Sequence, residues 1–372
     1  MMCMDNEFAP FLPQVKDWLL RRVPASGIRR VVPVLAALSS DIGAVRKENQ
    51  DRVALARGRD ARGNTYVVAA LADGIGGMKD GAGCAALTVS AVFDAVHRRA
   101  SGATVPSEWA ADAVKSAHQA VHMSYCGSGG ATLVLLLLTA KEGIYWASVG
   151  DSRLYVSSGE TLLQVSTDDT IAGQLGRAAE ADIDQKKLLQ FIGMGGPLEF
   201  EVSKLSGTAG NTALLTSDGV HFLASDSDLM SQVVRHAPDI GITARRLTEL
   251  ARWAGGPDNA TVAIVSLDVG LYESPPSYAC LDIWDPYGEI RIALIAREDQ
   301  LPVRSDVTST KSQPAKSKAP IKDLTAAETP TVDDVSAPTK IKGEKRKKGK
   351  RKPRAPRGTR APEVQFDFSD KS

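Results

Sequence analysis

The stretch Ala72-Asp73-Gly74-Ile75-Gly76-Gly77 separates two segments of different character. The apolar run at 66–71 predicts a buried strand, and the alanine-rich segment at 83–98 has its apolar residues at helical spacing. A carboxylate at the end of a strand is a hard oxygen ligand, and glycine lets the backbone carbonyl approach the same ion. Alone, the motif is better explained as an ordinary Asp-Gly turn.

Three further aspartates, Asp51, Asp218 and Asp258, border other apolar runs in the same way. Carboxylates that gather at one end of a sandwich of sheets repel one another unless cations lie between them. Oxygen-rich clusters suit Mg²⁺ or Mn²⁺, and these segments lack the Cys and His ligands of zinc sites. Each aspartate alone is explained as a turn cap, but four in this order predict a metal site.

The order of apolar patterns predicts an α+β protein. Strands are predicted at 34–39, 52–55, 66–71, 132–138, 144–149, 153–156, 161–165, 212–216 and 260–267, and helices at 83–98, 109–123, 228–235 and 243–253. Two helices follow each group of strands, which favours a four-layer α-β-β-α sandwich of two mostly antiparallel sheets flanked by helix pairs. The polar segment 167–197 predicts an inserted flap with a short helix.

Composition divides the 372-residue chain into four parts. We expect an N-terminal extension at 1–32, a main domain at 33–267, a C-terminal extension with a hairpin at 268–304, and a disordered tail at 305–372. Between Lys342 and Arg360 there are 11 Lys and Arg residues and one Glu, although the net charge of the chain is only +1. A basic tail therefore follows an acidic body.

The cysteines and apolar segments limit the class of protein. The four cysteines contain no CxxC pair, which argues against a zinc site of that spacing and for free cytosolic thiols. The N-terminus lacks a signal-peptide pattern. The longest nearly uncharged apolar stretch, 131–140, is shorter than the ~20 residues that a transmembrane helix needs. We therefore expect a cytoplasmic protein.

The motifs together resemble the metal-dependent protein phosphatases of the type 2C family, including the bacterial members. The resemblance extends from about Val34 to Val265. It rests on Gly43-Ala44-Val45-Arg46, Asn49-Gln50-Asp51, Asp73-Gly74-Ile75-Gly76-Gly77, Gly130-Ala131-Thr132, Gly150-Asp151-Ser152-Arg153, Ser217-Asp218-Gly219 and Asp258-Asn259.

This resemblance implies two Mn²⁺ or Mg²⁺ ions in a cleft between the sheets. By motif position, Asp73 bridges both ions and Gly74 supplies a carbonyl ligand. Asp218 and Asp258 hold one ion, and Asp51 lies by the first, directly or through water.

Two further residues of this sequence match functional positions of the family. Asp151 matches a residue that helps to bind a third, looser ion, and Arg46 matches the arginine that binds the substrate phosphate.

The implied reaction is hydrolysis of phosphoserine and phosphothreonine in proteins. Two cations lower the pKa of a shared water from near 16 toward about 7, so that the water attacks phosphorus without a covalent phosphoenzyme. The metals and the bidentate fork of Arg46 stabilise the charge on the equatorial oxygens. The sequence lacks a Cys-x5-Arg loop, which argues against a cysteine-dependent phosphatase.

Two departures from the family pattern keep a rival interpretation open. Position 75 is Ile where some members carry His, and position 50 is Gln where an acid is frequent. The rival is a catalytically weak or dead phosphatase-like binding module, with the basic tail binding nucleic acid or another polyanion through salt-sensitive contacts. The main reading implies instead a phosphoprotein substrate and a cognate serine/threonine kinase. We expect a monomer without a transmembrane segment.

Other candidate residues are interpreted as structural. His118 and His122 have the i, i+4 spacing of a two-histidine zinc site, but no Glu follows His118 and no third ligand is apparent. His221 is close to the Ser217-Asp218-Gly219 motif, and a structural role is expected for it. The Asp168-Asp169 pair is interpreted as a flap turn in preference to a contact with a third ion.

Overall fold

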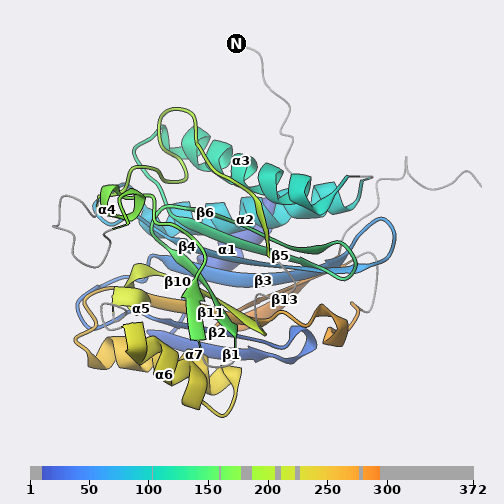
Figure 1. Ribbon diagram of the computed structural model, residues 1–372. Coiled ribbons are helices and arrows are strands. Elements are labelled where there is room, and N and C mark those ends of the chain that lie inside the picture. The colour runs from blue at the N-terminus through green and yellow to red at the C-terminus, as the bar shows by residue number, and fades with distance from the viewer. Residues whose placement is uncertain are drawn as a thin grey trace, which may run out of the picture. The chain divides into compact units, whose positions relative to one another are not determined.

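The computed structural model describes residues 11–102, 104–158, 161–176, 187–205, 211–222, 227–275 and 280–293. These residues form two antiparallel sheets packed face to face, with helices on both outer faces (Figure 1). The predicted α-β-β-α sandwich is therefore confirmed. The predicted disordered tail at 305–372 and residues 177–186 of the predicted flap lie outside the described residues.

One sheet has six described strands. In spatial order they are β1 (Ser26–Val31), β2 (Ala36–Asp41), β11 (Ala260–Ser266), β10 (Thr212–Thr216), β7 (Arg153–Ser158) and β8 (Thr161–Gln164). Short helices α5 (Asp218–His221) and α6 (Ser227–His236) and the longer α7 (Ile240–Trp253) belong to this half of the sandwich, and α7 packs on β2 and β11.

The other sheet has seven described strands. They are β13 (Gly288–Ala293), β12 (Cys280–Asp285), β3 (Asp51–Arg59), β4 (Thr65–Asp73), β5 (Leu133–Thr139), β6 (Gly143–Val149) and β9 (Ser203–Leu205). Helices α1 (Leu12–Leu19), α2 (Gly81–Ala100) and α3 (Pro106–Tyr125) cover its outer face, whereas α4 (Ile171–Gln174) lies in the predicted flap. Two 3-10 turns, Val32–Val34 and Val269–Leu271, complete the described elements.

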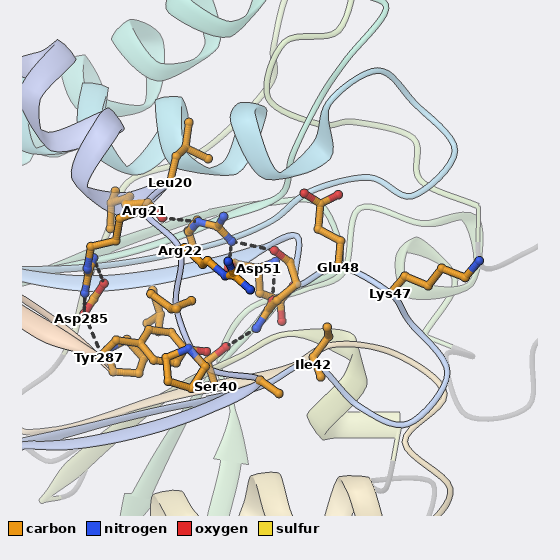
Figure 2. Close-up of a pocket in the computed structure, with 18 residues that line it drawn as sticks. Leu20, Arg21, Arg22, Ser40, Ile42, Lys47, Glu48, Asp51, Asp285 and Tyr287 are labelled. Atoms are coloured by element: carbon orange, nitrogen blue, oxygen red, sulfur yellow. Dashed lines mark hydrogen bonds and ion pairs between the residues drawn. The ribbon is translucent and has the colours of Figure 1, made fainter.

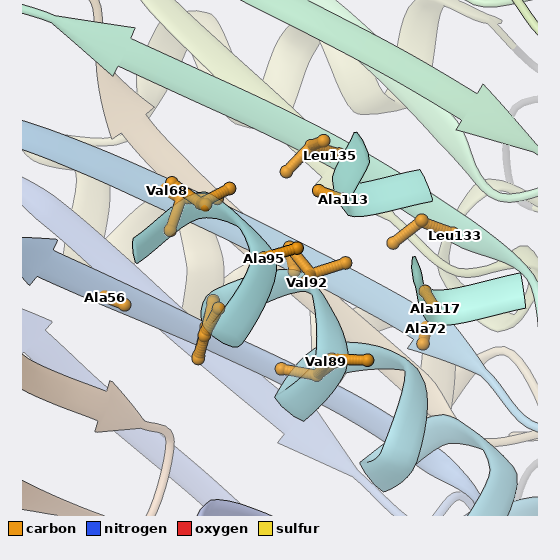
Figure 3. Packing of buried hydrophobic residues seen from close by; sticks show 14 of the residues in the cluster. Ala56, Val68, Ala72, Val89, Val92, Ala95, Ala113, Ala117, Leu133 and Leu135 are labelled. Atoms are coloured by element: carbon orange, nitrogen blue, oxygen red, sulfur yellow. The ribbon is translucent and has the colours of Figure 1, made fainter. Parts of the chain in front are cut away.

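Strand β5 is apolar at almost every position because both of its faces are buried. Its side chains alternate between faces, as in any strand. Leu133, Leu135 and Leu137 pack under α2 and α3, as Figure 3 shows for the first two. Val134 and its alternate neighbours pack between the two sheets. Since both faces are covered, a strand in the middle of the sheet needs apolar residues at every position.

Several predicted boundaries differ from the structure. The strand predicted at 52–55 extends to Arg59, although Arg57 and Gly58 resemble a turn. Arg57 is buried because it pairs with Asp282 of β12, and Gly58 gives room to the Tyr66 hydroxyl, which would lie 2.5 Å from a Cβ at that position. Tertiary partners therefore lengthen this strand beyond its apolar part.

The described parts of the predicted N-terminal and C-terminal extensions (1–32 and 268–304) pair with the sheets. Strand β1 lies beside β2, and the hairpin of β12 and β13 lies beside β3. Helix α1 packs on α2 with Val15 fully buried. The predicted limits of the main domain, at residues 32 and 268, stay a prediction. At each limit, a strand outside the predicted domain pairs with a strand inside it. Among the described helices, none is both long and apolar enough to span a membrane.

Candidate metal centre and active site

The first pair of candidate ligands is fixed by the register of two neighbouring strands. Asp51, the first residue of β3, lies directly opposite Asp73, the last residue of β4. Directly opposed residues of an antiparallel pair have Cβ atoms about 5 Å apart, so two carboxylates there repel each other. The pairing is destabilising unless a cation lies between them.

The second pair comes from the facing sheet. Asp218 follows the end of β10, and Asp258 precedes the start of β11, which is the antiparallel neighbour of β10. The end of one strand and the start of its antiparallel neighbour lie at the same edge of a sheet. The four predicted acids therefore meet at one end of the sandwich.

A cavity of about 380 Å³ lies between these strand ends. Its lining includes six of the seven predicted site residues. The full lining is Arg46, Gln50, Asp73, Gly74, Ile75, Gly76, Thr132, Asp151, Leu188, Asp218, Asp258 and Asn259. Of the predicted site residues, only Asp51 is absent from this lining, and its side chain is buried.

The Asp51 side chain accepts a hydrogen bond from the facing sheet. Ser217 Oγ donates a hydrogen bond of 2.8 Å to Asp51 Oδ2, and the Thr261 backbone N–H donates to Ser217 Oγ. The other oxygen, Asp51 Oδ1, is buried and has no hydrogen-bond partner in the described structure, and the same is true of Asp218 Oδ1. Buried carboxylate oxygens without partners are costly unless they bind a cation.

The raised pKa values of the clustered carboxyl groups also favour a bound cation. Burial raises the pKa of Asp51 to about 6, and the charges of Asp218 and Asp258 add to this effect. Burial raises the pKa of Asp151 to about 7, with Asp218 as the next cause. Burial and the charge of Asp51 raise the pKa of Asp73 well above its usual value. Burial, followed by the charge of Asp258, also raises the pKa of Asp218.

These observations fit a divalent cation site. The donors are hard carboxylate oxygens, two of them have unpartnered buried atoms, and their mutual repulsion raises several pKa values. Within the described residues the acids do not by themselves close into a set of three ligands. Asp258 instead forms an ion pair with Arg46, with 2.6 Å between Arg46 Nη2 and Asp258 Oδ2. The predicted phosphate-binding arginine and one predicted metal ligand therefore contact each other.

Asn259 positions the loop that carries Arg46 and Asp51. Its Oδ1 accepts a hydrogen bond from the Gln50 backbone N–H, and its Nδ2 donates to the backbone carbonyls of Ile42 and Glu48. The sequence predicts Asn259 only as part of the Asp258-Asn259 motif, without a role of its own. Its position after Asp258 marks it as part of the site. Its role could not be predicted, because its hydrogen-bond partners are more than 200 residues away in sequence.

Two glycines allow the strand ends to approach. Gly43 has φ +80°, and a Cβ there would lie 2.2 Å from the Asp258 carbonyl oxygen. Gly74, the predicted carbonyl ligand, donates its N–H to the Gln50 carbonyl, and a Cβ would lie 2.2 Å from the carbonyl oxygen of Gly81. A larger residue at either position would separate the segments that form the cavity.

Hydroxyl groups connect Asp73 to the neighbouring strands. Thr132 Oγ1 accepts a hydrogen bond of 2.9 Å from the Asp73 backbone N–H, and it shares a 2.7 Å hydrogen bond with Ser152 Oγ. Asp151 lies next to Ser152 and lines the cavity, as its predicted role requires. The predicted turn acids are structural: Asp168 pairs with Arg153, and Asp169 Oδ2 accepts from the Gly150 N–H.

The histidines of the sequence analysis have structural contacts. The rings of His118 and His122 are stacked, with centroids 6.2 Å apart, and both Nδ1 atoms contact the backbone of Gly193. His118 Nδ1 accepts the Gly193 N–H, so the neutral ring carries its proton on Nε2 and lacks a free metal-binding nitrogen. His221 is buried and shares a hydrogen bond with Thr216 Oγ1.

Comparison with known proteins identifies the family of this chain. A family model described as protein phosphatase 2C matches residues 44–253, which is more than half of the chain. The matched segment contains Arg46, Asp51, Asp73, Asp151 and Asp218 of the site. The chain belongs to the protein phosphatase 2C family.

Relatives of this phosphatase include protein phosphatase PhpP of Streptococcus pneumoniae. PhpP is 30% identical over 245 residues, which cover 62% of this chain and 97% of PhpP. The solved PPM Ser-Thr phosphatase MsPP of Mycobacterium smegmatis, in complex with cacodylate, has a TM-score of 0.52 at 27% identity and covers 63% of this chain and 99% of its own.

A second solved relative carries metal. The catalytic domain of the serine threonine protein phosphatase PstP, in complex with two manganese ions, has a TM-score of 0.50 at 25% identity. The match covers 65% of this chain and 100% of that domain. With its family and relatives established, the chain is a metal-dependent serine/threonine protein phosphatase.

Proposed function

We propose that the cavity between the two sheets hydrolyses phosphoserine and phosphothreonine side chains of proteins. The observation that carries this proposal is the convergence of Asp73, Asp151, Asp218 and Asp258 on one cavity whose rim also carries Arg46. A cluster of acids binds cations, and an arginine beside it binds the phosphate that those cations also attract.

Each residue has a role that follows from its position. Asp73 lies opposite Asp51 in the strand register and lines the cavity with Gly74, so these residues would hold the metal ions on this side of the cavity. Asp218 and Asp258 would hold an ion from the facing sheet. When bound, such cations lower the pKa of a nearby water and neutralise negative charge on a phosphoryl group.

Arg46 binds the substrate phosphate. Its side chain is exposed and pairs with Asp258 through one nitrogen, so it exchanges this partner for two phosphate oxygens when the substrate arrives. The fork of its guanidinium keeps the phosphoryl group oriented for attack by water on the side opposite the leaving serine or threonine oxygen. The Ile75 side chain cannot donate a proton to that oxygen.

The finer features of the family resemblance belong to the same proposal. We infer that the bound ions are Mn²⁺ or Mg²⁺ because the donor set is all oxygen. Asp151 lies on the cavity wall where it can help to bind a third ion. A cytoplasmic, monomeric enzyme acting opposite a cognate serine/threonine kinase is the cellular setting that we propose for it.

The test is hydrolysis of a phosphothreonine peptide by the full chain. Phosphate release is measured with Mn²⁺, with Mg²⁺ and with EDTA, for the wild type and for Asp73→Ala. We expect metal-dependent release that EDTA and the substitution both abolish, with an unchanged circular dichroism spectrum of the variant. Metal binding by calorimetry without any phosphate release would overturn the proposal and favour a binding module.

Arg46→Ala provides a separate test of phosphate binding. Loss of the guanidinium removes charge-assisted hydrogen bonds to the phosphate, so the Michaelis constant should rise about tenfold or more. A suitable control is Arg246→Ala, because Arg246 lies on α7 outside the cavity lining. An unchanged Michaelis constant for Arg46→Ala would contradict its assigned role.

A further inference from the structure

A second cavity, of about 440 Å³, lies behind the metal centre. Its walls come from the end of α1 and the segment after it (19–25), from residues 40–53, and from the turn of the β12–β13 hairpin (285–287). Figure 2 shows Lys47 and Glu48 on one side of this cavity and Arg21 and Asp285 on the other. We call it the rear cavity.

The rear cavity and the active-site cavity share one loop. Arg46 and Gln50 line the active-site cavity, whereas Lys47, Asn49 and Asp51 line the rear cavity. A ligand in the rear cavity therefore contacts the loop that positions both the phosphate-binding arginine and a metal ligand. Most of the remaining wall, including 19–25 and 285–287, lies outside the segment that the phosphatase family model matches.

Specific contacts hold the walls of the rear cavity together. Arg21 donates two hydrogen bonds, of 2.7 and 2.8 Å, to the two carboxylate oxygens of Asp285 (Figure 2). Asp285 Oδ1 also accepts the backbone N–H groups of Tyr287 and Gly288. The Tyr287 ring packs on Gly27, where a Cβ would lie 2.4 Å from the ring. The two chain segments that flank the catalytic core are thus joined at this cavity.

Arg52 lies in the wall without a carboxylate hydrogen-bond partner. Its Nε donates to the Leu19 carbonyl, and its Nη1 donates to the carbonyls of Asn49 and Asp51. Burial lowers the pKa of Arg52, but a guanidinium remains protonated in proteins. In the described structure Nη2 makes no hydrogen bond and is not sealed from solvent, so its two N–H groups remain available to a ligand.

The remaining charges favour an anion. The basic side chains of the lining are Arg21, Arg22, Lys47 and Arg52, and the acidic ones are Glu48, Asp51 and Asp285. Asp285 is neutralised by Arg21, and Asp51 belongs to the metal centre. Arg22 and Lys47 form no ion pair within the described part of the chain. Apart from the Arg21–Asp285 pair, the lining carries three basic side chains, Arg22, Lys47 and Arg52, and two acidic ones, Glu48 and Asp51, so its net charge is positive.

We propose that the rear cavity is a second ligand site, which binds a phosphate monoester. Arg22 and Arg52 hold the phosphate, because guanidinium forks match its oxygen geometry. The carbon part of the ligand lies on the apolar wall formed by Leu20, Val23, Pro24, Ile42 and Pro286. Binding there changes the Michaelis constant of the neighbouring active site through the shared loop. The ligand is either a free metabolite or a second phosphorylated side chain of the substrate protein.

Binding is tested on the metal-free full chain, in EDTA, by titrating inorganic phosphate and O-phosphoserine in a calorimeter. We compare the wild type with Arg22→Gln, which removes a charge from an exposed side chain, and with Ala25→Phe, which fills the cavity without changing charge. Lys141→Gln, an equal loss of charge in the β5–β6 turn, is the matched control. Both cavity variants should weaken binding at least fivefold, and the control should not.

Two outcomes would overturn the proposal. One is that the metal-free wild type binds neither probe. The other is that Arg22→Gln and Ala25→Phe, shown to be folded by circular dichroism, bind as tightly as the control. Because these titrations need no turnover, they are independent of the proposed reaction.

Turnover with metal then separates the two sources of the ligand. If the ligand is a second phosphorylated side chain, a doubly phosphorylated peptide has a lower Michaelis constant than the singly phosphorylated one, and Arg22→Gln removes the difference. If it is a free metabolite, the two peptides behave alike. O-phosphoserine then changes the Michaelis constant of the wild type by more than competition for the active site explains. In Arg22→Gln only the effect of competition remains.

Discussion

At the scale of single residues, the carboxylate cluster is a local source of instability that the fold tolerates. Asp51 and Asp73 face each other across two strands, and the pKa of each is raised by burial. Such groups favour either a proton or a cation nearby. The same property that makes the metal-free cluster unfavourable makes it a strong site for divalent ions.

Replacing Asp73 with Asn tests this trade between stability and function. The amide keeps the shape of the side chain but removes one of the repelling charges. In EDTA at pH 8 we expect the free energy of unfolding to rise by about 1 kcal/mol, measured by urea denaturation. Phosphopeptide turnover with Mn²⁺ should disappear. A variant that is both less stable and still active would contradict the repulsion argument.

His97 predicts a dependence of stability on pH. It lies on α2 beside the Tyr66 hydroxyl and the Phe11 ring, and burial lowers its pKa to about 4. The unfolded chain has a histidine pKa of about 6.5, so between these values it binds more protons than the folded chain. The free energy of unfolding therefore falls as the pH is lowered from about 6.5 to about 4.

The size of this loss is up to about 3 kcal/mol, because each pKa unit corresponds to about 1.4 kcal/mol. Urea denaturation at several pH values measures it. His97→Leu should flatten the curve in this window, while His236→Gln, an exposed histidine on α6, should leave the curve as in the wild type. Equal curves for the wild type and His97→Leu would show that other groups cause the dependence.

At the scale of elements, the β12–β13 hairpin is attached to the catalytic sheet by a buried ion pair. Asp282 of β12 accepts from Arg57 of β3 at 2.8 Å and from Arg291 of β13. Arg57 and Asp282 have side chains only 5% and 4% exposed. Burying charges is favourable only when each keeps its partner, so this contact joins two strands that are far apart in the sequence.

Asp282→Ala should therefore be costly. It leaves the Arg57 guanidinium buried without its carboxylate, which costs about 3–5 kcal/mol. Thermal and urea denaturation measure the loss. Glu249→Ala is the contrasting control, because its pair with Arg245 has both side chains 59% exposed and contributes about 0.5 kcal/mol or less. Similar losses for both variants would refute the buried-pair argument.

At the scale of the whole molecule, the described residues all belong to one unit that ends at Val303. The second unit, 304–372, contains the basic segment that the sequence analysis connects with polyanion binding. A chain ending at Val303 should keep its melting temperature within about 2 °C, because the sheets and both cavities lie in the first unit.

The same truncation should leave phosphopeptide turnover unchanged and remove salt-sensitive binding to a polyanion such as heparin. Turnover assays and binding titrations at low and high salt measure both. Retention of polyanion binding after truncation would place that property in the catalytic unit. Loss of turnover would show that the second unit contributes to the active site.

The amino-acid sequence by itself determined the order of strands and helices and the acids at the strand ends. These features have local signals, since β5 is apolar at every position and Asp73 follows an apolar strand directly. The sequence did not reveal β1, because Ser26–Val31 is a half-exposed edge strand with two arginines and only a weak apolar pattern.

Only the tertiary structure decided which distant residues meet. It paired Arg46 with Asp258, gave Asn259 the task of holding the Arg46 loop, and joined Arg21 to Asp285 beside a second cavity. Each of these contacts joins residues more than 200 positions apart. Local periodicity reports the environment of a segment, whereas such contacts depend on strand register and sheet packing, which no single segment contains.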